Sequence, residues 1–154
     1  MRKIKILLYI IIFIGLSSCG YSRLNNESNE FNFKSIEING DKRLSYILKN
    51  KLSLLSKPES EKSYDLYINL TSSKTSKIKD ATGKTTRFSM VLNGDLKLSD
   101  NNKVFANRSF SVNNDYDVSK NHSDTIRNEK NSIQNNIESL SEEISKYIQL
   151  ISLN

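Results

Sequence analysis

The sequence predicts an α+β fold: a two-layer sandwich in which a four-stranded, mostly antiparallel sheet carries two helices on one face. Four segments alternate apolar and polar residues with the period of two that is typical of strands. Two further segments repeat apolar residues every three or four positions, as on one side of a helix. Their order along the chain is β-α-β-β-β-α. A sheet with one apolar face needs a cover, and two helices can provide it.

An apolar run near the N-terminus has the layout of a secretory signal. Arg2, Lys3 and Lys5 precede this run, which covers residues 6–16. A helix of its eleven residues would span only about 16 Å, whereas the hydrocarbon core of a bilayer is about 30 Å thick. We therefore expect a cleaved signal peptide, and the alternative is an uncleaved signal anchor with an incidental cysteine.

The apolar run is followed closely by Cys19, the single cysteine of the chain. The stretch Leu16-Ser17-Ser18-Cys19 resembles a bacterial lipobox, in which the cysteine is acylated and becomes the new N-terminus. Two or more acyl chains on Cys19 would give stable membrane anchoring. In lipoproteins of this type, Gly20 in place of Asp points to the outer membrane. The expected organisation is a signal peptide over residues 1–18, a lipidated N-terminus and tether over 19–30, and a single α+β domain over 31–154.

The charge of the chain falls when the leader is set aside. Residues 1–18 hold three of the 23 basic residues, which leaves 20 basic against 17 acidic residues and lowers the net charge from +6 to +3. Such a mildly basic exported domain argues against a nucleic-acid partner. With Cys19 acylated no free thiol remains, so we expect no disulfide, thiol catalysis or cysteine–metal site. No cofactor is expected apart from the covalent lipid on Cys19.

The first strand and the first helix are expected to form one unit. Ile36 and Ile38 alternate with polar residues and predict a strand over residues 33–39. Asp41 is a plausible N-cap for a helix over 42–55, because its carboxylate can accept a free backbone N–H of the first turn. The apolar stripe of that helix comprises Leu44, Ile47, Leu48, Leu52 and Leu55.

Three more strands are predicted, over residues 64–70, 87–98 and 104–113, and the last two form an antiparallel hairpin. Residues 71–78 are rich in Ser, Thr and Lys and are interpreted as a loop that leads to a hairpin tip at 80–84. Gly94 lies in register with apolar residues, which indicates a bulge or a close approach by another backbone. The last strand places Val104, Ala106, Phe110 and Val112 on one face, with Arg108 interrupting them.

The C-terminal segment predicts a long helix from about Ser123 to Ile151. One side of it is apolar throughout, and the other sides carry Asn, Ser, Glu and Lys. We expect this helix to pack on the sheet, and the alternative is a coiled coil. Its apolar stripe comprises Ile126, Ile133, Ile137, Leu140, Ile144, Ile148 and Ile151.

The chain offers little support for catalysis. His122, the only histidine, stands among polar residues at the start of the last helix and is expected to be a solvated cap residue. No Ser-His-Asp arrangement and no metal-ligand spacing are legible. We therefore expect a protein that is not an enzyme.

Basic residues gather around the tip that joins the second and third strands. They are Lys74, Lys77, Lys79, Lys84 and Arg87. One interpretation is a solvated loop in a lysine-rich protein. The other is a cationic tip that meets phosphate groups, which lysine binds as a point charge and arginine as a two-pronged donor.

The whole layout resembles the LPS-assembly lipoprotein family (LptE). The features that carry the resemblance are the lipobox ending Cys19-Gly20-Tyr21, the strand–helix pair over 36–55, Tyr64-Asp65-Leu66, the loop ending Gly83-Lys84-Thr85-Thr86-Arg87-Phe88, Asn114-Asp115-Tyr116-Asp117, and the long C-terminal helix. Members of this family sit largely inside the lumen of a large outer-membrane β-barrel.

The resemblance implies a non-enzymatic lipoprotein on the periplasmic side of the outer membrane. It implies plugging and assembly of the lipopolysaccharide-transport β-barrel and delivery of lipopolysaccharide to the cell surface. The implied partners are that barrel protein, lipopolysaccharide and, through the lipid anchor, the outer membrane. Lys77, Lys79, Lys84 and Arg87 are the candidate residues for contact with lipopolysaccharide or the barrel. The alternatives are an auxiliary lipoprotein of an ABC-type envelope lipid transporter and a periplasmic hydrolase that depends on His122.

Overall fold

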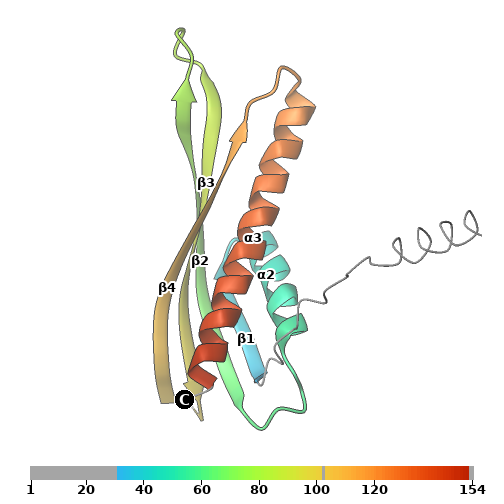
Figure 1. The fold of residues 1–154 in the computed structure, drawn as a ribbon, viewed down its shortest axis with the longest axis vertical. Helices are drawn as coiled ribbons and strands as arrows, with labels where there is room; N and C mark the ends of the chain where they lie inside the picture. The colour runs from blue at the N-terminus through green and yellow to red at the C-terminus, as the bar shows by residue number, and fades with distance from the viewer. Residues whose placement is uncertain (1–30, 102, 153–154) are drawn as a thin grey trace, which may run out of the picture.

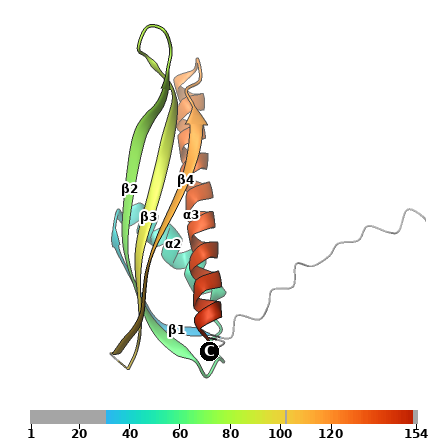
Figure 2. The same cartoon turned by 60° about the vertical axis from the view of Figure 1, so that its left-hand side comes forward.

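The computed structural model describes residues 31–101 and 103–152 and confirms the predicted fold class. The sheet has the order β1-β2-β3-β4, with β1 and β2 parallel and the other neighbours antiparallel. Both helices cover one face of this sheet (Figures 1 and 2). The elements are β1 (Asn32–Gly40), α2 (Lys42–Leu55), β2 (Ser63–Lys79), β3 (Thr85–Asp100), β4 (Lys103–Asp117) and α3 (His122–Ser152). The signal peptide, Cys19 and the tether predicted over 1–30 lie outside the described residues.

One hydrophobic core fills the space between the sheet and the two helices. Alternate residues of the strands point into it, as the period of two predicts. Gly94 lies in unbroken register opposite Leu70 and Phe110, and a Cβ there would meet Leu140 of α3 at 3.5 Å. Gly94 therefore marks neither a bulge nor a close approach by another backbone, because the nearest atoms belong to side chains at ordinary contact distance. The core side chains with no solvent exposure include Phe31, Leu48, Leu52, Ile68, Leu96, Leu98, Ile137, Leu140, Ile144 and Ile148.

Helix α2 begins and ends where the sequence predicts. The carboxylate of Asp41 accepts hydrogen bonds from the backbone N–H of Arg43 at 2.9 Å and of Leu44 at 3.0 Å, which satisfies two of the free donors of the first turn. Leu44, Leu48 and Leu52 of its apolar stripe are buried against the sheet.

The ladder between β1 and β2 ends at Gly40, which pairs with Leu70. Gly40 has a φ of +127°, and a Cβ at this position would lie directly on the carbonyl oxygen of Leu70 and 3.0 Å from its carbonyl carbon. Only glycine accommodates both the backbone angle and the close approach. The chain leaves the sheet here and enters α2, while β2 continues with β3 as its only neighbouring strand.

The predicted loop over residues 71–78 is wrong, because β2 continues as strand to Lys79. Every residue from 71 to 79 is exposed, so this half of the strand lacks the alternation that marks a half-buried one. Pairing with β3 holds it, from Thr71 opposite Asn93 to Ser76 opposite Phe88. β3 and β4 also extend beyond their predicted ends for the same reason.

The predicted core position Val104 of β4 is wrong, and the predicted interruption at Arg108 is confirmed. A register shift between Leu98 and Ser99 turns Val104 outward, and Val104 is 57% exposed. Arg108 interrupts the apolar face because its guanidinium lies over the rings of Phe110 and Tyr147, at 5.3 and 4.7 Å from the ring centroids.

Helix α3 packs on the sheet, as predicted, but its two halves do so by different chemistry. The C-terminal half uses the apolar stripe. In the N-terminal half, side chains four residues apart donate to strand carbonyls: Asn128 to Asp117, Ser132 to Asn114, and Asn136 to Met90, at 3.1, 2.9 and 2.7 Å. The predicted stripe position Ile126 is 54% exposed. The part of the sheet next to the β2–β3 turn, which we call the distal part, is therefore held to α3 largely by hydrogen bonds.

The helix-free face of the sheet is polar. Its residues form side-chain hydrogen bonds across neighbouring strands, which the period-two register places side by side. These cross-strand bonds join Ser35 to Asp65, Asn39 to Tyr67, Ser109 to Asp95 and Ser111 to Asn93, at 2.7, 2.8, 2.6 and 2.7 Å.

Candidate functional site

The candidate residues Lys77, Lys79, Lys84 and Arg87, which we call the basic tip, lie at the end of the β2–β3 hairpin, in agreement with the predicted tip (Figure 1). The turn itself is built around Asp80. Its carboxylate accepts hydrogen bonds from the hydroxyl and N–H of Thr82 and from the N–H of Lys84, at 2.6, 2.9 and 3.0 Å. These bonds lower the pKa of Asp80, with the hydroxyl of Thr82 as the largest cause.

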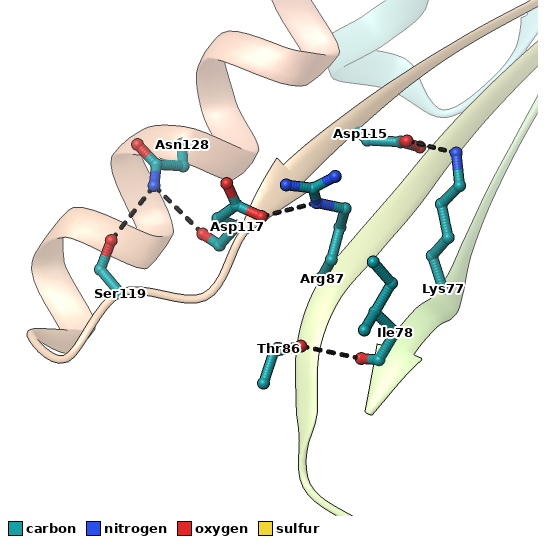
Figure 3. A network of polar contacts seen from close by, with 8 residues as sticks. All are labelled: Lys77, Ile78, Thr86, Arg87, Asp115, Asp117, Ser119 and Asn128. Carbon is teal, nitrogen blue, oxygen red and sulfur yellow. Dashed lines mark hydrogen bonds and ion pairs between the residues drawn. The ribbon is translucent and has the colours of Figure 1, made fainter. Parts of the chain in front are cut away.

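Two of the four basic side chains are engaged within the sheet (Figure 3). Lys77 pairs with Asp115 of β4, and Arg87 pairs with Asp117 of β4 at 2.6 Å. Each pair lowers the pKa of its carboxyl group, and the partnership with Asp117 raises the pKa of Arg87. The positive charges of Lys77 and Arg87 are thus balanced locally.

Lys74 lies on the opposite, helix-facing side of β2. Its ammonium group is 2.8 Å from the carboxylate of Glu129 on α3 and 4.5 and 5.3 Å from the ring centroids of Phe88 and Tyr116. Burial alone would lower the pKa of Lys74, but Glu129 and Tyr116 hold it above its usual value. Lys74 therefore joins the hairpin to α3.

Lys79 and Lys84 differ from these residues. Among residues 31–101 and 103–152, neither side chain has a carboxylate within ion-pair distance, and both lie at exposed positions. The structure thus brings the predicted cluster together and leaves Lys79 and Lys84 without an ion pair among the described residues, although the charge of Lys84 helps to lower the pKa of Asp80. The sequence alone does not distinguish Lys79 and Lys84 from the paired cations, because the ion pairs of Lys77 and Arg87 depend on the register between β3 and β4.

A groove of about 590 Å³ between α2 and α3 was not predicted. The apolar part of its lining includes Leu44, Ile47, Ile133 and the exposed Ile126. Lys51 crosses the groove region to pair with Glu138 at 3.0 Å. The sequence signal that could have indicated this groove is the continuation of the apolar stripe of α3 to Ile126. The remaining lining residues are Arg43, Glu129, Lys130, Gln134 and Ile137.

The described residues offer little support for a metal site, a histidine-dependent site or a membrane-spanning helix. The described residues contain no group of three or more His, Cys, Asp or Glu side chains that could hold a metal ion. His122 is exposed at the first position of α3, as expected. None of the described helices is both long enough and apolar enough to cross a membrane.

Comparison with known proteins places the fold. The structure is similar to that of rare lipoprotein B from Shewanella oneidensis, with a TM-score of 0.59 and 11% identity over 80% of this chain and 96% of that one. It is similar to a minor lipoprotein from Acinetobacter baumannii, with a TM-score of 0.57 and 18% identity over 79% and 94% of the two chains. The chain shares their fold.

A third solved structure agrees with these two. It is uncharacterized lipoprotein B from Nitrosomonas europaea, with a TM-score of 0.58 and 15% identity over 84% of this chain and 91% of that one. No protein-family model matches the sequence, and no curated protein sequence matches it. The similarity is therefore one of fold, and it covers nearly the whole of each solved lipoprotein chain.

Proposed function

We propose that this protein is a non-enzymatic lipoprotein, anchored through Cys19 on the periplasmic side of the outer membrane. In this proposal it plugs and helps assemble the lipopolysaccharide-transport β-barrel and assists delivery of lipopolysaccharide to the cell surface. The lipobox-like sequence at residues 16–19 supports the anchor. The fold shared with solved lipoproteins supports the class.

The helix-free face of the sheet is the observation that carries the plug role. The interior of a large outer-membrane barrel is polar, since its strands alternate apolar residues outward and polar residues inward. A domain inside such a lumen needs a broad polar surface. The serine, aspartate and asparagine side chains of this face, such as Ser109, Asp95 and Asn93, meet that need.

The basic tip supports the part of the proposal that concerns lipopolysaccharide. Lys79 and Lys84 project from the end of the hairpin as exposed point charges that suit phosphate groups. Lys77 and Arg87 act differently, because their partners Asp115 and Asp117 already neutralise them. We assign these two to the rigidity of the tip and the first two to ligand contact.

The tip assignment is tested with the purified full-length protein in detergent and labelled lipopolysaccharide. The double variant K79E/K84E should weaken binding at least about tenfold, which corresponds to about 1.4 kcal/mol. The matched control K49E/K103E makes the same charge change at exposed positions on α2 and β4 and should leave binding unchanged. Equal binding by the wild type and K79E/K84E would show that the tip does not contact lipopolysaccharide.

A further inference from the structure

We propose that the free edge of β2 over residues 71–76 is a docking site for a partner protein, which adds an extended segment there as a fifth strand. The segment would pair through its backbone, a mode known from other proteins that complete a sheet with a strand from a partner. This inference does not depend on lipopolysaccharide binding.

The edge is free because of the way β1 ends. Gly40 closes the β1–β2 ladder opposite Leu70, and the chain then turns into α2. From Thr71 onward β2 is paired on one side only, with β3, and the register stays regular as far as Ser76. Alternate backbone groups of these six residues therefore point away from β3 with no strand of the described chain beside them.

The lysines that would guard this edge are drawn away from it. Proteins commonly protect exposed edges with lysine side chains that deter another strand. Here Lys74 turns under the sheet to Glu129 and the rings of Phe88 and Tyr116. Lys77 lies across β3 and pairs with Asp115. The side chains left along the edge are Ser and Thr, which allow close approach by another backbone.

The opposite edge of the sheet is treated differently. At the distal end of β4, side chains of α3 take up backbone carbonyls: Asn128 binds that of Asp117, and Ser132 binds that of Asn114. In the described chain, no side-chain hydrogen bond of this kind reaches the backbone of residues 71–76. At this end of the sheet, the contrast identifies residues 71–76 of β2 as the available edge.

The surroundings define the chemistry of the partner segment. Six paired residues correspond to about 20 Å of extended chain. Next to this stretch, Ile78 is 47% exposed, and Lys79 is exposed without a carboxylate of the described residues within ion-pair distance. The fitting segment is extended, has small or polar side chains opposite the serines and threonines, and carries an acidic residue at the end that lies near Lys79.

The test compares backbone hydrogen exchange of the full-length protein in isolated cell envelopes and after purification in detergent. Exchange is read at single-residue resolution by fragmentation and mass spectrometry. In the purified protein, every second amide over 71–76 should exchange fast, since only alternate amides face β3. In envelopes, those fast amides should slow at least about tenfold, because the added strand accepts their hydrogen bonds.

Two variants control for the position of the contact. S73K/T75K adds lysines beside the β2 edge and should abolish the slowing of exchange. N107K/N113K makes the same kind of change on the outer face of β4 and should leave the slowing unchanged. Equal exchange in both preparations, or slowing that persists in S73K/T75K, would overturn the proposal. If the outward amides of residues 71–76 exchange slowly in the purified protein and become fast when that protein is diluted, the occupant is a second copy of this chain. That result would overturn the assignment to a partner protein.

Discussion

Replacement of Gly40 by alanine should be one of the most destabilising single changes in this chain. At a φ of +127°, a side chain strains the backbone by about 1–3 kcal/mol. The new Cβ would also coincide with the carbonyl oxygen of Leu70, so the end of the β1–β2 ladder must shift, at a further cost of about 1–3 kcal/mol. We expect Gly40→Ala to lower the free energy of unfolding by about 4 kcal/mol, a large part of an ordinary domain's stability.

Two other glycines provide matched controls. Gly83 has a φ of +83° and open space around it, so Gly83→Ala should cost only the backbone strain of about 1–2 kcal/mol. At Gly94 a Cβ would make ordinary contacts with Leu140 and Ile68, so alanine there should be neutral or slightly stabilising. Urea unfolding followed by circular dichroism measures all three. A cost at Gly40 no greater than that at Gly83 would show that the contact with the Leu70 carbonyl does not restrict this position.

Three further predictions concern α3 and the distal hairpin. Leu140→Ala should cost about 2–5 kcal/mol, whereas Ile126→Ala should change the free energy of unfolding by no more than about 0.5 kcal/mol, because only the first side chain is buried; comparable costs would contradict the assigned packing. Asn136→Ala should cost about 1–3 kcal/mol in the same assay by leaving a buried strand carbonyl unpaired, and an unchanged midpoint would argue against that bond. The pKa values of Asp115 and Asp117 are lowered in the folded protein, so both carboxylates stabilise the fold at a pH above their unfolded pKa of about 3.9. This stabilisation is lost as the pH falls through their folded pKa values. Acidification should therefore reduce the free energy of unfolding less in D115N/D117N than in the wild type.

Local patterns predicted the elements that have one buried face. The stripe of α2 and the alternation in β3 reflect contact with the core, and the cap at Asp41 reflects a local bond to the first helical turn, so all three appear in the sequence. The distal half of β2 has no such contact. Its serines and threonines are exposed on both faces, and the strand exists there because β3 supplies a partner, which local composition does not reveal.

The candidate site shows the same division. The basic residues could be found by counting, and the turn could be placed by Asp80 and Gly83. Their electrostatic roles depend on which residues lie opposite across two strands, as for Arg87 and Asp117. In the sequence, the side chains of Asn128, Ser132 and Asn136 belong to the polar part of a helix. In the structure they donate hydrogen bonds to strand carbonyls.

We propose that this domain occupies an outer-membrane β-barrel. The most direct measurement is affinity isolation of the tagged full-length protein from envelopes solubilised in mild detergent, followed by identification and quantification of what accompanies it by mass spectrometry. We expect one large β-barrel protein at about a one-to-one ratio. Recovery of transporter subunits without a barrel would contradict it, and Lys79 and Lys84 would then be solvated residues of a hairpin tip.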